Sequence, residues 1–226
     1  MRKKLTIGGV VAIAALGAAT LAYAVVGVAF SASVTGKAGK PAGIKVHIAS
    51  SDPAAPQPPI MDRITLKLQS GGKFNGKKFP KCNANTLLSK GPSGCPKGSK
   101  IGTGKGVGYA KPVVTDPVNA KLTLFNGGSV INVFVLPDLG PTFITPCKVS
   151  SSYTTIDCTV PPIKTLPSAP DAAVGTVDTT TPVLKFKKLA LIVAPKKCKG
   201  TWKMSGTFHF TSGQSVTTPF SQKCKK

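Results

Sequence analysis

After its first 40 residues the chain alternates apolar and polar residues with a period of two, the pattern of a β-strand with one buried face. Apolar side chains fall on every second position in residues 44–48 and 64–68. Residues 122–125 and 130–136 flank an Asn-Gly-Gly sequence that begins at Asn126, which is typical of a β-hairpin turn. Beyond the N-terminal segment, no stretch sustains the 3.6-residue period of a helix. The pattern therefore predicts an all-β, antiparallel fold.

The strand predicted over residues 201–210 gives the clearest core face, because large apolar side chains occupy its even positions and polar ones its odd positions. Residues 130–136 are apolar at nearly every position, so we expect that strand to be central and covered on both faces. The predicted core consists of Trp202, Met204, Phe208, Phe210, Leu66, Leu68, Val133 and Val135.

Three segments depart from simple alternation. Every even position from 102 to 108 is glycine, so one face of that strand lacks side chains; an aromatic side chain from a facing sheet, or else a flat ligand, is expected to fill the gap. In residues 184–191 the apolar phase slips at Lys187-Lys188, which indicates a β-bulge. Residues 161–182 are rich in Pro and Thr and predict a long low-complexity loop.

The N-terminus has the composition of an export signal. Three basic residues (2–4) precede an uncharged, apolar run over residues 5–30. The run is also long enough to cross a bilayer if it is not cleaved. Small residues at 22–24 and at 31–33 suit a signal peptidase, so cleavage and retention as an anchor both remain open. Either way, the positive start stays in the cytoplasm and the rest of the chain lies outside, extracellular or in the cell envelope.

Six cysteines fit an exported chain, since an even number of them outside the cytoplasm indicates disulfides. They are Cys82, Cys95, Cys147, Cys158, Cys198 and Cys224. Pairing in sequence order is expected, because Cys147 and Cys158 would face each other across a hairpin and the last two would close another. No pair has C-x-x-C spacing and the chain has only two histidines, so we predict no metal site and no cofactor.

The full architectural prediction is thus a disulfide-stapled antiparallel β-sandwich behind an N-terminal export or anchor helix. Residues 1–33 are assigned to the signal peptide or anchor, residues 34–42 to a flexible spacer, and residues 43–226 to a single β-sandwich domain.

Charge is concentrated in two blocks. The formal net charge is +23. Residues 67–111 and residues 185–226 hold most of the lysines and no acid, whereas residues 112–184 are slightly acidic. If the fold joins the blocks, the protein has a cationic face that attracts anions. The candidate anion-binding residues are Lys73, Lys77, Lys78, Lys97, Lys100, Lys105, Lys185, Lys187, Lys188, Lys196 and Lys197.

The chain is poorly equipped for catalysis. It has no Glu, its seven acids are scattered Asp, and paired carboxylates of the glycosidase kind are not apparent. His47 and His209 fall on polar strand faces, and no G-x-S-x-G motif is present. The glycines around 98–108 match neither the P-loop nor the dinucleotide-binding pattern. We therefore predict a protein that is not an enzyme.

One segment, Phe79-Pro80-Lys81-Cys82 followed by Cys95-Pro96-Lys97-Gly98-Ser99-Lys100-Ile101-Gly102-Thr103-Gly104, resembles a pattern in uncharacterised secreted β proteins of high-GC Gram-positive bacteria. The resemblance covers about 30 of the 226 residues. It implies export and a β fold, and it implies no activity or catalytic residue.

These features predict a non-catalytic envelope or surface protein with a lysine-rich face. Its expected partners are anionic envelope polymers or lipid head groups. Nucleic acid is disfavoured, because forked arginines and stacking aromatics are scarce and the chain is exported. The sequence leaves oligomeric state open. The alternatives are a secreted hydrolase of unrecognised type, which would need a pocket holding a titratable pair, and a purely structural envelope component. Lysines that serve only solubility are the simplest competing explanation.

Overall fold

The computed structural model describes residues 26–55, 57–111, 114–163 and 171–226. Within these residues the chain is almost entirely strand, with one α-helix and two short 3₁₀ turns at Gly76–Lys78 and Pro92–Gly94. The elements are β1 (Gly27–Thr35), β2 (Pro41–Ser51), β3 (Met61–Lys67), β4 (Lys73–Phe74), α1 (Ala84–Lys90), β5 (Lys100–Ala110), β6 (Val114–Asn126), β7 (Val130–Pro137), β8 (Phe143–Val149), β9 (Thr155–Thr159), β10 (Ala173–Thr181), β11 (Lys185–Phe186), β12 (Leu189–Ala190), β13 (Ile192–Val193), β14 (Thr201–Phe210) and β15 (Ser215–Lys223).

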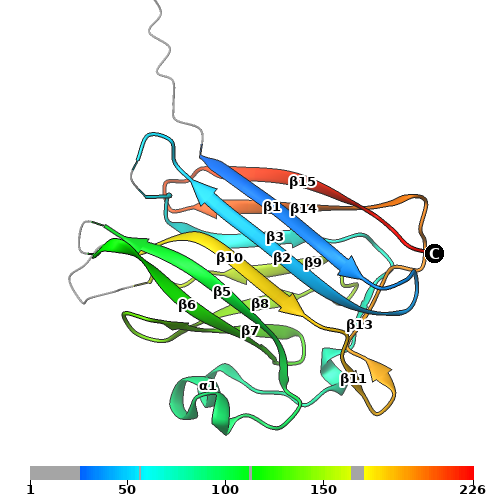
Figure 1. Cartoon of the computed structure of the whole chain (residues 1–226). Helices are drawn as coiled ribbons and strands as arrows, with labels where there is room; N and C mark the ends of the chain where they lie inside the picture. The colour runs from blue at the N-terminus through cyan, green and yellow to red at the C-terminus, as the bar shows by residue number, and fades with distance from the viewer. Residues whose placement is uncertain (1–25, 56, 112–113, 164–170) are drawn as a thin grey trace, which may run out of the picture.

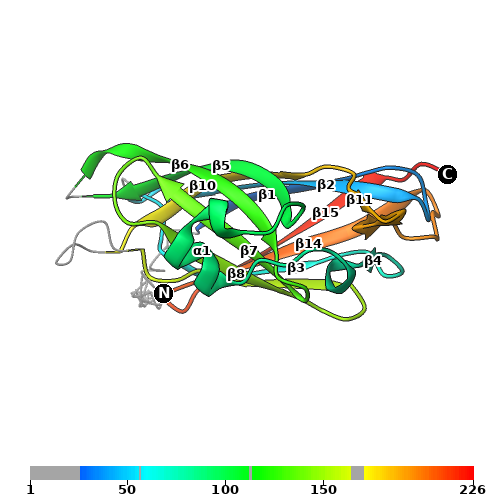
Figure 2. The same cartoon turned by 90° about the horizontal axis from the view of Figure 1, so that it is seen from below.

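The predicted all-β, antiparallel, disulfide-stapled fold is confirmed, but its long strands form one continuous sheet where two were expected, and the short β11 and β12 pair separately. The hydrogen-bonded order is β15-β14-β3-β9-β8-β7-β6-β5-β10-β2, with β1 beside β2 and with the short β13 and β4 beyond the end of β2. Figures 1 and 2 show that this sheet folds over, so that β6, β5, β10 and β2 lie above β7, β8, β3 and β14. The β6–β7 hairpin joins the layers at one edge.

At the other edge β1 and β15 come together through side chains. The Thr218 hydroxyl donates to the Val28 carbonyl at 3.1 Å. The Gln222 amide accepts from the Val34 N–H at 2.7 Å and donates to the Val34 carbonyl at 2.9 Å. The backbone groups that β1 presents away from β2 are thus partly satisfied, which limits an edge that could otherwise pair with another chain.

The predicted core is present. Trp202, Met204, Phe208 and Phe210 are buried on the inner face of β14, together with Leu66 and Val135; Leu68 and Val133 are partly buried and pack against them. Phe208 is fully buried, and its ring lies 5.9 Å from that of Phe30 in β1. The period-two pattern identified this face because β14 packs one face against the other layer and exposes its other face to solvent.

The predicted boundaries at the N-terminus are wrong. Residues 27–35, placed in the export segment and the spacer, form β1, and residues 41–42 already belong to β2. Phe30 and Ala32 are buried in the main core. The reason is that residues 26–34 place their larger apolar side chains at even positions, but Gly27 and Ala29 at odd positions give no polar contrast, and the serines at 31 and 33 follow only after the apolar run. Residues 1–25, which carry the rest of the predicted export helix, lie outside the described residues. In the portion of the chain that is described, no helix has the length and hydropathy to cross a membrane.

The predicted loop over residues 161–182 is also wrong in its second half. Residues 173–181 form β10, which lies between β5 and β2 in the sheet. Its many threonines and valines are β-branched and favour a strand despite their low complexity. Residues 164–170 lie outside the described residues.

Lys187 and Lys188 form the turn of a two-residue hairpin between β11 and β12, and the predicted bulge is absent there. Both residues have positive φ, 47° and 65°. This is the backbone pattern of a type I′ turn, for which Asn-Gly is the usual sequence. The phase slip in the sequence therefore marked a reversal of the chain.

The glycine-rich strand is β5. A Cβ at Gly102 or Gly104 would collide with the backbone of the neighbouring β10. At Gly106 and Gly108 the missing side chains leave space between the layers. One aromatic side chain, Phe143 from the facing layer, lies among the residues around this space, but it does not fill it, and the other lining residues are aliphatic or small.

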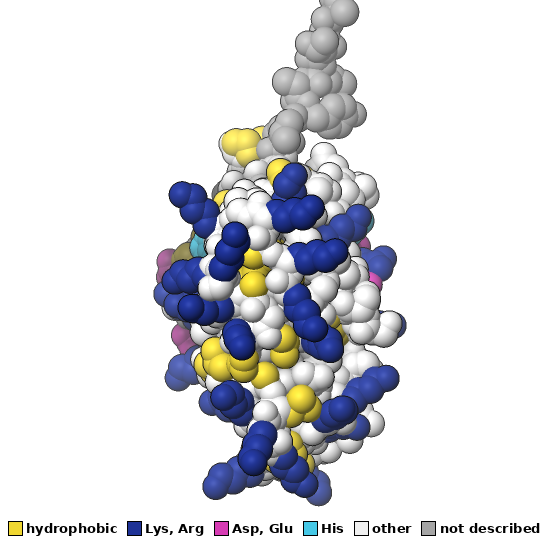
Figure 3. All heavy atoms as spheres, turned by 90° about the vertical axis from the view of Figure 1, so that its right-hand side faces the viewer, with side chains coloured by type: hydrophobic (Ala, Val, Ile, Leu, Met, Phe, Trp, Pro, Cys, Tyr) yellow, Lys and Arg dark blue, Asp and Glu magenta, His cyan; other side chains and the backbone are white. Residues whose placement is uncertain are grey.

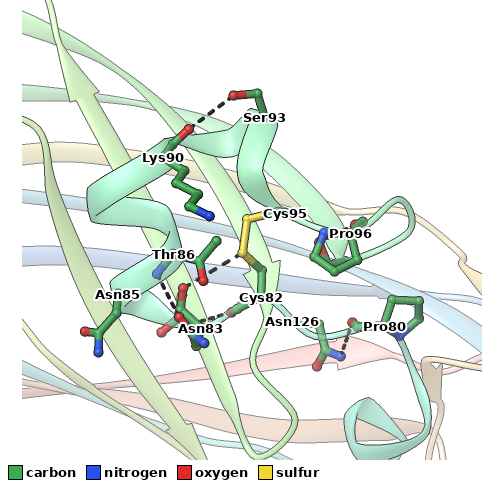
Figure 4. The surroundings of a disulfide bond; sticks show 12 residues. Pro80, Cys82, Asn83, Asn85, Thr86, Lys90, Ser93, Cys95, Pro96 and Asn126 are labelled. Carbon is green, nitrogen blue, oxygen red and sulfur yellow. Dashed lines mark hydrogen bonds between the residues drawn. A yellow bond between two sulfur atoms is a disulfide. The ribbon is translucent and has the colours of Figure 1, made fainter.

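The three disulfides pair in sequence order: Cys82–Cys95, Cys147–Cys158 and Cys198–Cys224. Cys147 and Cys158 are direct partners across β8 and β9, as the hairpin argument required. Between Cys82 and Cys95 lies a helix that the periodicity missed. The helix α1 is only seven residues long, with Asn83 as its N-cap accepting from the Thr86 N–H at 2.7 Å (Figure 4).

Candidate anion-binding site

One end of the folded sheet carries lysines on four separate segments of the chain. Figure 3 looks onto this end, where dark blue lysine and arginine side chains are spread over the surface and acidic side chains appear only at its margin. We call it the lysine-rich end and define it by Lys37, Lys40, Lys73, Lys196, Lys197, Lys199, Lys223, Lys225 and Lys226, all of which are exposed.

Backbone contacts hold these segments together. The β1–β2 turn lies against the segment before β14, where the Gly39 N–H donates to the Pro195 carbonyl at 3.2 Å. The same turn reaches the C-terminus, since the Ala38 N–H donates to the Lys225 carbonyl at 2.8 Å. Lys73 pairs with Val193 across β4 and β13. The lysines thus gather from segments that are distant in sequence.

A covalent bond and a buried ring fix the centre of this end. Cys198 is bonded to Cys224, and the Cys224 N–H donates to the Gly200 carbonyl at 3.1 Å. The indole N–H of buried Trp202 donates to the Lys197 carbonyl at 3.0 Å. The lysine backbones are therefore held by the fold while their side chains remain in solvent, an arrangement that suits attraction of a polyanion.

All the predicted anion-binding residues except Lys105 divide into three groups. Lys73, Lys196 and Lys197 lie at the lysine-rich end. The lysines of the β11–β12 hairpin lie beside the lysines of the 3₁₀ turn Gly76–Lys78, because Phe186 packs against Phe79 with ring centroids 5.7 Å apart. They are Lys77, Lys78, Lys185, Lys187 and Lys188.

Two further predicted residues, Lys97 and Lys100, flank Ser99, whose carbonyl accepts from the Asn126 N–H at the β6–β7 turn. Lys105 does not belong to these groups. It lies in the middle of β5, opposite Asp178 on one side and Lys121 on the other. The prediction of one face made from both lysine blocks therefore fails for Lys105.

The sequence-based prediction missed most of this end. Lys37 and Lys40 fell in the supposed spacer, and Lys199, Lys223, Lys225 and Lys226 were not selected. The hairpin closed by Cys198 and Cys224 was the available signal, because it returns the C-terminus to the start of β14.

Most carboxylates lie at the opposite end of the sheet. This end is formed by the β2–β3 and β7–β8 connections, the starts of β3 and β6, and the segment before β10. These residues are Asp52, Asp62, Asp116, Asp138 and Asp171. Two others lie in mid-sheet beside basic side chains: Asp157 accepts two bonds from Arg63 at 2.8 and 2.6 Å, and Asp178 lies 2.7 Å from His47. The protein is thus electrically polar along its strands.

The ion pair between Arg63 and Asp157 changes the pKa of the carboxylate. Hydrogen bonds from the Arg63 guanidinium, and a weaker one from the Thr65 hydroxyl at 3.1 Å, lower the pKa of Asp157 below its usual value. Elsewhere, burial raises the pKa of the Tyr153 phenol, which stacks on Phe74 with ring centroids 5.8 Å apart. These are surface and core interactions and do not assemble a reactive group.

The histidines lie on the sheet surface. His47 contacts Asp178, and His209 lies 2.8 Å from the Ser215 hydroxyl across β14 and β15. Both pairs are exposed and bordered by strand residues. Among the described residues, no group of three His, Cys, Asp or Glu is placed to hold a metal ion. A cavity between the two layers of the sheet is lined by no His, Asp, Glu, Lys or Arg, so it does not hold the titratable pair that a hydrolase would need.

No known family model matches the chain, and no curated protein matches it in sequence. Function is therefore inferred from the geometry alone.

Proposed function

We propose that this protein is a non-catalytic component of the exterior of the cell, which binds anionic envelope polymers through its lysine-rich end. The observation that carries the proposal is the gathering of lysines from four separate segments on one end, with the acids at the other. Three disulfides are typical of proteins that fold in an oxidising compartment, which is where such polymers are found.

The composition of the end favours diffuse binding to a polymer. Lysine makes point contacts with phosphate or carboxylate and does not read shape as the forked guanidinium of arginine does. Several lysines on loops within a Debye length, about 8–10 Å at moderate salt, act on one polyanion together. Little preference for a particular sequence or repeat unit is expected.

A polymer is favoured over a bilayer surface. Proteins that lie on membranes combine basic residues with apolar side chains that enter the head-group region. The large apolar side chains that are exposed in the described part of the chain are Leu88, Leu136, Leu139 and Val183. Of these, Leu136 and Leu139 lie at the opposite end, and Val183, which follows the end of β10 near the start of β2, is an aliphatic residue close to the lysines. Binding to anionic lipid is therefore the alternative outcome to be tested.

The export signal belongs to the same proposal. Cleavage after residues 22–24 would leave β1 whole, because β1 begins at Gly27. Cleavage after residues 31–33 would remove buried Phe30 and Ala32 from the core. We therefore favour the first site, and N-terminal sequencing of the exported protein decides between them.

The binding test compares two triple variants of equal charge. Lys196, Lys197 and Lys199 are changed to Gln at the lysine-rich end; Lys45, Lys105 and Lys121, which are exposed in mid-strand, are changed to Gln as the control. Duplex DNA serves as the test polyanion because its salt dependence is known. For the end variant, the slope of log affinity against log salt should become less negative by about 0.9 for each phosphate that the protein no longer neutralises.

Equal weakening by both triple variants would mean that only net charge matters, and the site would be abandoned. Failure of the parent to bind DNA, inorganic polyphosphate and anionic vesicles at low salt would leave the lysines with a role in solubility and the protein as a structural component. Binding to anionic vesicles but not to polyphosphate would replace the polymer by a lipid surface.

A further inference from the structure

A cavity of about 210 Å³ lies between the two layers of the folded sheet. Strands β2, β3, β5, β6, β7, β8, β9 and β10 contribute to its wall. Folded proteins pack their interiors closely, and a space of this size is uncommon in a single domain. An engineered apolar cavity of about 150 Å³ already admits benzene.

The space follows from which side chains face inward. On β5, Gly106 and Gly108 line the space with backbone only, and Ala120, which pairs with Gly106 in the same layer, adds one methyl group. In the facing layer, Val133 and Thr145 are β-branched and short. The aromatic residues Phe30, Trp202 and Phe208 are buried on the other side of the core, in β1 and β14. The aliphatic half of the core is therefore built with less volume than its walls enclose.

The chemistry of the wall selects for an uncharged, apolar occupant. Its side chains are aliphatic apart from Phe143, the Cys147–Cys158 disulfide and a few threonines, and no lining residue is ionisable. A charged group inside would lose its hydration without a compensating partner. An alkyl or terpene-like group would gain the burial of its whole surface.

The cavity reaches the surface at the end of the molecule away from the lysines. Leu139, Gly140 and Pro141, in the loop between β7 and β8, line the cavity and are exposed; the Leu139 side chain is 52% exposed. This loop gives a path from solvent to the interior. Asp138 in the loop and Asp116 in β6 are also exposed there, and they would repel the head group of an anionic amphiphile.

We infer that the interior of the sheet is a binding site for a small, uncharged, hydrocarbon-like molecule, which enters beside the β7–β8 loop. The site is independent of the lysine-rich end, so the protein would bind an apolar ligand and a polyanion at opposite ends. The occupant is uncharged, and it is small enough to fit a cavity of about 210 Å³, as benzene or a medium-length alkyl chain is.

The test uses the exported protein with octan-1-ol and octanoate as probes, which share a chain length and differ in charge. Binding is measured by calorimetry and by the rise in Tm with ligand concentration. Octan-1-ol should bind with one site, and octanoate at least tenfold more weakly at pH 7. The triple lysine variant at the lysine-rich end should bind octan-1-ol as the parent does.

A filled cavity provides the decisive comparison. Val133→Phe adds a ring to the cavity wall and should weaken octan-1-ol binding at least tenfold, and Ala120→Leu should do the same from the facing layer. Val130 lies on the same strand but does not line the cavity, so Val130→Phe should leave octan-1-ol binding unchanged. The Tm of each variant without ligand shows whether it is folded.

Absence of saturable octan-1-ol binding to the parent would overturn the inference, as would unchanged affinity in folded Val133→Phe and Ala120→Leu proteins. Equal affinity for octanoate would overturn the requirement for an uncharged ligand. Loss of polyanion binding in the lysine variant, with octan-1-ol binding retained, would separate this site from the proposed function.

Discussion

The side chain of Asn126 holds the disulfide-bonded segment before α1 against the β6–β7 hairpin, and its removal is the sharpest test of the fold. Asn126 is fully buried. Its amide donates to the Pro80 carbonyl at 2.8 Å (Figure 4) and to the Gly76 carbonyl at 2.9 Å. Its oxygen accepts from the Gly128 N–H at 3.1 Å. One side chain thus satisfies backbone groups on both sides of the contact.

The expected cost follows from counting those groups. Asn126→Ala removes a partner from the Pro80 carbonyl, from the Phe79 carbonyl at 3.4 Å and from the Gly128 N–H, whereas the Gly76 carbonyl keeps its bond from the Phe79 N–H at 3.0 Å. Each group left without a partner costs about 1–3 kcal/mol. Taking the low end for each, the free energy of unfolding should fall by about 3 kcal/mol. Asn132→Ala is the matched control, because Asn132 is also buried but makes one bond, to the Cys82 carbonyl at 3.0 Å. That variant should lose about 1 kcal/mol.

Denaturant unfolding of the two variants and the parent, with disulfides intact, measures the difference. The midpoint should fall much further for Asn126→Ala while the slope of the transition stays the same. Equal losses for the two variants would show that the hydrogen bonds of Asn126 add nothing beyond its packing. A loss below that of Asn132→Ala would refute the assigned geometry.

Other substitutions test separate parts of the structure. Phe208→Ala should destabilise the protein by about 3–5 kcal/mol and Thr207→Ala by little, and equal denaturant midpoints would show that the inner face of β14 is misassigned. Asp157→Asn should lower the denaturant midpoint at pH 7. Because the pKa of Asp157 is lowered in the folded state, the difference in stability from the parent should vanish as the pH falls through that pKa. A difference that persists in acid would contradict the ion pair. Replacing Lys187 by Asn and Lys188 by Gly should stabilise the β11–β12 turn by about 1 kcal/mol, and a loss of stability on thermal unfolding would argue against the positive φ angles.

Local patterns predicted those parts of the fold whose cause is local. The inner face of β14 was readable because one strand with one wet face shows period two by itself. The β6–β7 hairpin was readable because Asn126 and the two glycines after it form the turn. The pairing of Cys147 with Cys158 followed from hairpin geometry, and their register in the structure agrees with it.

Features that depend on neighbours were missed. β1 was hidden because its first residues end a long apolar run, in which Gly27 and Ala29 at odd positions give no polar contrast to the even face that packs into the core. β10 was read as a loop because its threonines seem polar, but its place between β5 and β2 is decided by strands far away in sequence. The helix α1 is too short for periodicity, and its Asn83 cap and following Gly91 were the signals available.

The two candidate sites show the same limit more strongly. The lysine-rich end exists because antiparallel strands return Lys37, Lys199 and Lys225 to one place. The interior cavity exists because the glycines of β5 face other small side chains across the layers. Lysine content and a glycine repeat were visible in the sequence, but their consequences appear only when the sheet folds over.

Lysine footprinting tests the central claim, that the lysine-rich end is the polyanion site. The folded protein is acetylated with and without inorganic polyphosphate, and modification is read at each lysine by peptide mass spectrometry. Lys37, Lys196 and Lys225 should be protected by polyphosphate at low salt and released at high salt, while Lys45 and Lys105 change little. Uniform protection of all five lysines, or protection confined to the mid-strand pair, would contradict the assignment of the polyanion site to this end.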